Sequence, residues 1–124
     1  MSAAKDFRIG NLADDVLCLT LELCGKDAAH TPRFPARFYD SLVKEIIGAA
    51  LEIHEDVFLA NEDREIGYGE RRRLKARAEA KCVHLNHLIR VSEERGWISE
   101  KQCERWQGLV TNLRWMIYNW QKPK

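Results

Sequence analysis

Residues 98–120, ISEKQCERWQGLVTNLRWMIYNW, carry the clearest structural signal in this sequence. Ser99 and Gln102 have the spacing of a capping box, in which each side chain satisfies a backbone amide of the first helical turn. Apolar residues then recur at steps of three or four, which is the spacing of one face of an α-helix. That stripe consists of Trp106, Leu109, Val110, Leu113, Ile117 and Trp120. We therefore predict a helix over 99–121 with one apolar face against the rest of the chain.

Three further segments, 11–24, 35–62 and 70–95, show the same helical period. We expect Asn11 to cap the first of them and Gly25 to end it in the left-handed conformation. Pro35 suits the first turn of the second, and Gly96 suits the end of the third. Four helices joined by short connections predict a single all-α domain over residues 1–124, folded as an antiparallel up-down-up-down four-helix bundle.

Composition agrees with one globular domain. The chain has 124 residues, of which 45% are hydrophobic and 31% are charged, so it is not of the disordered class. Its net charge of +1 argues neither for nor against a nucleic-acid partner. Residues 1–10 lack the apolar run of a signal peptide, and the longest apolar stretch, 16–23, is too short to span a bilayer. The four cysteines form no C-x-x-C pair, which favours reduced, buried thiols in a cytoplasmic protein: Cys18, Cys24, Cys82 and Cys103.

The sequence contains no pattern typical of an enzyme. A di-iron bundle needs Glu-x-x-His motifs, and neither His84 nor His87 has a glutamate at the required offset. Cys82 falls on an apolar stripe, which indicates a core thiol rather than a nucleophile. Gly67 and Gly69 do not match a phosphate-binding loop. We expect no catalytic residue, metal, cofactor or small-molecule substrate.

The one uneven charge feature lies at the start of the third predicted helix. Within residues 71–81 a single acid, Glu79, accompanies six cations: Arg71, Arg72, Arg73, Lys75, Arg77 and Lys81. Arg73, Arg77 and Lys81 recur at steps of four and would form a ridge that can follow a phosphate backbone. The alternative is a solvated helix face with salt bridges to neighbours such as Glu70 and Glu79.

A second clue is the breadth of the apolar surface. The helix predicted over 35–62 carries an additional apolar stripe, and Trp115 and Tyr118 lie off the main stripe of the last helix. Large aromatics on a second helix face are typical of an interface, although a broad core would give the same pattern. We predict self-association through a set of five residues: Val43, Ile47, Phe58, Trp115 and Tyr118.

Three stretches taken together resemble a known family. They are FPARFYDSLVKEIIGAALEIHEDVFLAN at 34–61, RRRLKARAEAKCVHLNHLIRVSEERGWISEKQ at 71–102 and LVTNLRWMIYNW at 109–120. The pattern resembles the accessory variability determinant family of diversity-generating retroelements, which is related to the bundle proteins encoded in 23S rRNA intervening sequences. The resemblance implies a ring-like homopentamer of four-helix subunits, some of which bind RNA or a reverse transcriptase through basic surface residues.

The resulting expectation is a non-enzymatic, homo-oligomeric accessory protein. It would contact nucleic acid, or a nucleic-acid enzyme such as a reverse transcriptase, through the six cations of residues 71–81. The alternative is a structural or protein-interaction scaffold with no nucleic-acid role.

Overall fold

The computed structural model describes residues 7–62 and 67–120, and within these residues the secondary structure is helical. The four α-helices are α2 (Arg8–Cys24), α3 (Lys44–Glu62), α4 (Tyr68–Glu94) and α5 (Glu100–Tyr118). A 3₁₀ turn, η1 (Ala36–Phe38), and a π-helical turn, η2 (Tyr39–Val43), lead into α3. The all-α class predicted from the sequence is confirmed.

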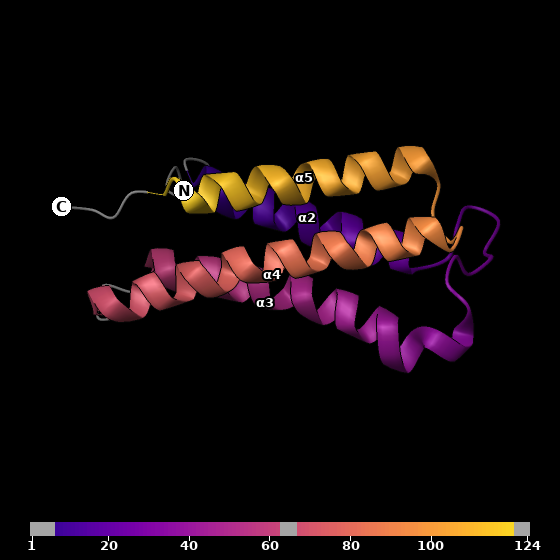
Figure 1. The fold of residues 1–124 in the computed structure, drawn as a ribbon, viewed down its shortest axis with the longest axis horizontal. Helices are drawn as coiled ribbons and strands as arrows, with labels where there is room; N and C mark the ends of the chain where they lie inside the picture. Colours follow the sequence, from indigo (N-terminus) through magenta and orange to yellow (C-terminus); the bar gives the residue numbers. More distant parts are fainter. Residues whose placement is uncertain (1–6, 63–66, 121–124) are drawn as a thin grey trace.

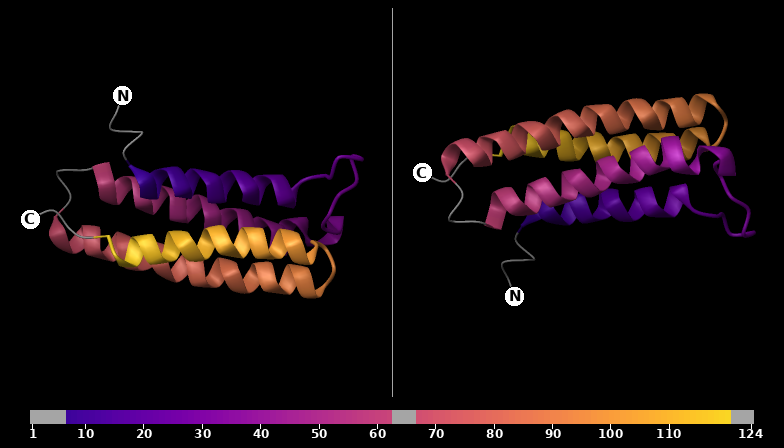
Figure 2. Two further views of the ribbon diagram at one scale, coloured as in Figure 1. Left: turned by 90° about the horizontal axis from the view of Figure 1, so that it is seen from above. Right: turned by 90° about the horizontal axis from the view of Figure 1, so that it is seen from below.

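The helices pack side by side and consecutive helices run in opposite directions (Figure 1). Each helix has two neighbours: α2 lies beside α3 and α5, and α4 lies beside α3 and α5. Figure 2 shows that the start of α2, the end of α3, the start of α4 and the end of α5 share one end of the bundle. The chain therefore forms an up-down-up-down four-helix bundle.

The core of the described residues is mostly apolar, and one hydrogen-bonded pair, Trp106 with Thr20, lies inside it. Trp106 of α5 is fully buried, and its indole Nε1 donates to the hydroxyl of Thr20 in α2 at 3.0 Å. The same hydroxyl donates to the carbonyl of Val16 at 2.7 Å. Both polar groups are thus satisfied inside the core, which removes the cost of burying them.

Two predicted helix ends are confirmed. Ser99 caps α5, with the Gln102 amide donating to its Oγ at 3.0 Å and the Ser99 amide donating to Gln102 Oε1 at 2.8 Å. Gly96 follows α4 with φ of +79°, the left-handed conformation that glycine adopts without steric cost.

The predicted end of α2 at Cys24 is confirmed, whereas its predicted start and the predicted left-handed conformation of Gly25 are wrong. The helix begins at Arg8, one turn before the expected boundary, so Asn11 lies inside it rather than at its cap. Gly25 is extended, with φ of −95°. Arg33 takes over the terminating role, because its Nη1 donates to the carbonyls of Glu22, Gly25 and Lys26 at 2.9–3.3 Å. A cation at these carbonyls satisfies the helix end and makes a left-handed residue unnecessary.

The start of the second predicted helix also differs. Pro35 precedes the 3₁₀ turn, and the π-helical turn follows before α3 begins at Lys44. Leu42 is half-buried and Val43 is buried. Val43 precedes the buried residues Ile46 and Ala50 by three and seven positions, which places it on the same helix face. Val43 therefore belongs to the core of this chain.

Candidate nucleic-acid interface

The basic segment 71–81 occupies the first turns of α4, where it lies against α3. Two of its cations reach carboxylates on α3 that are one helical turn apart. Arg77 Nη2 lies 3.1 Å from Asp56 Oδ1, and Lys81 Nζ lies 2.7 Å from Glu52 Oε1. Arg71 continues the series by donating to the carbonyl of Ala60 at 2.7 Å. These three contacts join α3 to α4 over several turns.

The Asp56–Arg77 pair is the most buried member of this series. The Asp56 side chain is 1% exposed, while that of Arg77 is 47% exposed. Burial raises the pKa of Asp56 above its usual value, and the nearby guanidinium of Arg77 only partly offsets that rise. The pKa of Glu52, by contrast, is lowered by its hydrogen bond with Lys81.

The cations of the predicted phosphate-binding ridge, Arg73, Arg77 and Lys81, pair with carboxylates of the same chain. Besides Arg77 and Lys81, Arg73 makes two hydrogen bonds to Glu70 at 2.6 and 3.0 Å. Of the two salt bridges expected for a solvated face, that to Glu70 is confirmed. Glu79 instead faces Arg114 of α5, with Arg114 Nε 3.7 Å from its carboxylate. Arg77 and Lys81 thus join α4 to α3, and Arg73 is paired within α4.

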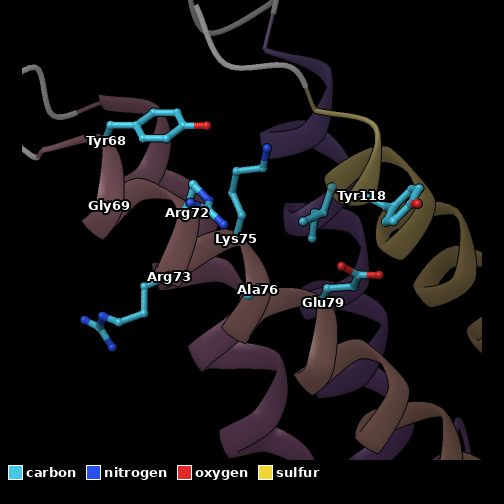
Figure 3. Close-up of a pocket in the computed structure, with 9 residues that line it drawn as sticks. Tyr68, Gly69, Arg72, Arg73, Lys75, Ala76, Glu79 and Tyr118 are labelled. Atoms are coloured by element: carbon cyan, nitrogen blue, oxygen red, sulfur yellow. The ribbon is translucent and has the colours of Figure 1, made fainter.

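The remaining cations lie at an open groove between the start of α4 and the end of α5. The groove has a volume of about 620 Å³, and Figure 3 shows Arg72 and Lys75 on α4 with Tyr118 across from them on α5. The Arg72 guanidinium lies 5.6 Å from the centre of the Tyr68 ring, within the range of a cation–π contact. Lys75 Nζ donates to the carbonyl of Trp120 and lies 5.8 Å from its ring centre.

Two exposed tyrosines give this groove its aromatic surface. Tyr68 is 56% exposed and Tyr118 is 62% exposed. Trp115, also exposed, meets the Tyr118 ring edge-on with centroids 5.7 Å apart. The basic–aromatic groove, defined by Tyr68, Arg72, Arg73, Lys75, Glu79 and Tyr118, can therefore offer both ring faces and cations to a ligand.

Sequence reasoning missed Tyr68 and Glu79 as members of this groove. Tyr68 stands between two glycines and precedes the helix predicted over 70–95, whereas α4 begins at it. The successive steps from Tyr68 to Arg72, Lys75 and Glu79 are four, three and four residues, which places all of them on one helix face. This spacing is the sequence signal that indicates a shared face for the four residues.

The predicted self-association residues fall into three groups. Val43 is buried in the chain's own core, so it has no exposed surface to offer a neighbouring subunit. Ile47 and Phe58 are half-buried, and the Phe58 ring packs edge-on against Phe7 at 5.4 Å. Trp115 and Tyr118 are exposed. The broad apolar arc of α3 is thus largely covered within one chain.

The cysteines and histidines do not assemble into a site. Burial raises the pKa of Cys24 and of Cys82 to about 12, which keeps both thiols protonated. Cys18 is exposed because it lies on the outer face of α2, so its predicted burial is wrong. Within residues 7–62 and 67–120, no group of three or more His, Cys, Asp or Glu side chains is arranged to hold a metal ion.

None of the helices in these described ranges combines the length and apolar character of a membrane span. Comparison of the chain with protein-family models, with curated proteins and with solved structures finds no match in any of the three. The similarity to the accessory variability determinant family therefore rests on the sequence stretches quoted above.

Proposed function

We propose that this chain is a non-enzymatic accessory protein of the cytoplasm that binds nucleic acid in the basic–aromatic groove. The observation that supports this most is the combination of two exposed tyrosine rings with Arg72 and Lys75 in one open groove. Surfaces that bind single-stranded nucleic acid combine these two elements: rings stack on bases, and cations neutralise phosphates.

The proposal narrows the six predicted cations to those at the groove. Arg77 and Lys81 contact carboxylates of α3, so their charge is already balanced within the chain. Arg72 contacts the Tyr68 ring, a partner that leaves its positive charge uncompensated. Arg72 is therefore the first candidate for a phosphate contact, with Lys75 and Arg73 beside it.

Self-association is part of the proposal. A single groove with two or three phosphate contacts binds weakly, and several copies in one assembly would multiply that contact. The family resemblance suggests a ring of five subunits, and exposed Trp115 is the residue best placed to contact a neighbour. Tyr118 is assigned to the groove, since one ring cannot stack on a base and pack in a subunit interface at once.

The binding test uses a fluorescent single-stranded RNA and anisotropy at several salt concentrations. For single strands, a plot of the logarithm of the binding constant against the logarithm of salt concentration has a slope of about −0.7 per phosphate contact. Two or three contacts in one groove therefore predict a slope between about −1.4 and about −2.1. Arg72→Glu should lower affinity and make the slope shallower. Arg105→Glu is the matched control, because Arg105 is exposed at the opposite end of α5 and the charge change is the same.

Two results would count against the proposal. Equal losses of RNA affinity in Arg72→Glu and Arg105→Glu would mean that binding depends on the net charge of the protein and not on the groove. Absence of binding at low salt would remove the nucleic-acid role and direct the search to a protein partner such as a reverse transcriptase. Self-association has its own test: light scattering that gives 14.4 kDa, the mass of one chain, would contradict it.

The alternative is a structural or protein-interaction scaffold without a nucleic-acid role. The contacts of Arg77 and Lys81 with α3 favour it, since they show that much of the basic segment serves the fold. In that case the exposed aromatics Tyr68, Trp115 and Tyr118 would meet another protein.

A further inference from the structure

One acidic side chain, Glu79, lines the basic–aromatic groove together with its cations. It lies on the same face of α4 as Lys75, one turn further along the helix. Figure 3 shows its carboxylate directed toward the side of the groove that Tyr118 occupies. A carboxylate repels phosphate, so this part of the groove suits a group that donates hydrogen bonds.

The Glu79 carboxylate retains hydrogen-bonding capacity. Its ionic partner, Arg114 Nε, is 3.7 Å away, which is longer than a hydrogen bond. Arg114 Nε is itself buried with no hydrogen-bond partner among the described residues. The Arg114 guanidinium lies 5.0 Å from the centre of the Trp115 ring, a contact that positions it beside the carboxylate. The oxygens of Glu79 can therefore accept bonds from a ligand.

A base stacked on Tyr118 would bring its edge toward this carboxylate. The Tyr118 ring is largely exposed, and its edge-on contact with Trp115 supports it from one side. Single-stranded RNA is recognised in this way, by stacking of a base on an aromatic ring and hydrogen bonds to its Watson–Crick edge. Guanine carries two adjacent N–H donors on that edge, and they match the two oxygens of a carboxylate.

Resting on the proposed function, the geometry points to a binding site for an unpaired guanine nucleotide of a single strand. Guanine stacks on Tyr118 and donates to Glu79, while its phosphate lies toward Arg72. Glu79 is thus the residue that selects the base, and Arg72 binds every sequence alike.

The test compares short fluorescent oligouridylates that carry one central guanosine, adenosine or cytidine with the all-uridine strand. We expect the native protein to bind the guanosine strand about tenfold more tightly than the other three, the discrimination of one good bidentate contact. Glu79→Gln should abolish that preference. Glu104→Gln removes the same charge from an exposed position at the far end of α5 and should keep the preference.

The outcomes separate this inference from the proposed function. Equal, salt-sensitive binding of all four strands would overturn guanine selection while supporting nucleic-acid binding. A guanosine preference that persists in Glu79→Gln would overturn the role of Glu79. No binding of any strand would overturn the proposed function itself. Thermal unfolding of each variant shows that it is folded.

Discussion

Replacing Arg77 by methionine tests whether the basic segment of α4 serves the fold. Methionine keeps an unbranched apolar stem but removes both hydrogen bonds to Asp56, at 3.1 and 3.2 Å. The Asp56 carboxylate, 1% exposed, would lose its cationic partner. A buried charge without a partner is strongly destabilising, and breaking such a pair typically costs about 3–5 kcal/mol.

The expected loss has an upper limit, because the buried carboxyl can take up a proton instead of remaining charged. Protonating an aspartate of ordinary pKa, about 3.9, costs about 4 kcal/mol at pH 7. Arg77 is 47% exposed, so water reaches the pair and reduces the loss. We expect Arg77→Met to lower the free energy of unfolding by about 2–4 kcal/mol, or the melting temperature by roughly 4 °C per kcal/mol.

The pH dependence of the free energy of unfolding tests whether the Asp56 charge causes the destabilisation. The pKa of Asp56 is raised in the folded protein, so its protonated form favours folding, and that contribution is lost as pH rises through the folded pKa. Without Arg77 the pKa rises further. The difference in free energy of unfolding between the native chain and Arg77→Met should therefore decrease as pH falls toward about 4. Adding Asp56→Asn, which removes the charge, should recover most of the loss at pH 7.

Urea unfolding followed by circular dichroism measures these differences. Arg72→Met is the matched control, since Arg72 is exposed and contacts only the Tyr68 ring among its described interactions; its effect should stay within about 0.5 kcal/mol. Equal effects of the two substitutions, or a deficit of Arg77→Met that does not change with pH, would refute the assignment of Arg77 to the fold.

Three further predictions concern the core and its edges. Thr20→Val leaves the buried indole N–H of Trp106 without its acceptor, so it should lower the free energy of unfolding in urea by about 1–3 kcal/mol. Thr20→Ser keeps the hydroxyl and should lower it by about 1 kcal/mol. A larger loss from Thr20→Ser than from Thr20→Val would contradict the hydrogen bond. Cys18 should react with a thiol reagent in the native protein, while Cys82, whose pKa burial raises to about 12, should react only on unfolding; equal native rates would be inconsistent with the burial. Gly96→Ala places a methyl group at a residue with φ of +79°, where no other atom lies within 4 Å. Backbone strain alone should therefore lower the stability by about 1 kcal/mol. An unchanged melting curve would argue against the left-handed conformation.

The features that the sequence determined are those set within one or two helical turns. The period of apolar residues places the four helices, and the Ser99–Gln102 box and Gly96 mark two of their ends where the structure has them. Each of these signals depends on residues at most a few positions apart, so no knowledge of the remaining chain is needed. The all-α bundle follows from them.

The features that only the tertiary structure decided depend on which helices are neighbours and in what register. Arg77 looks like a free cation until α3 places Asp56 beside it, from 21 positions away. Leu42 and Val43 are adjacent apolar residues, and only packing against the neighbouring elements buries Val43 and leaves Leu42 half-buried. The groove exists because the first turn of α4 and the last turn of α5 meet at one end of the bundle, which brings Tyr68 and Tyr118 to the same opening (Figure 3). Helix formation is local, but the pairing of charges and the shape of a site depend on packing between distant segments.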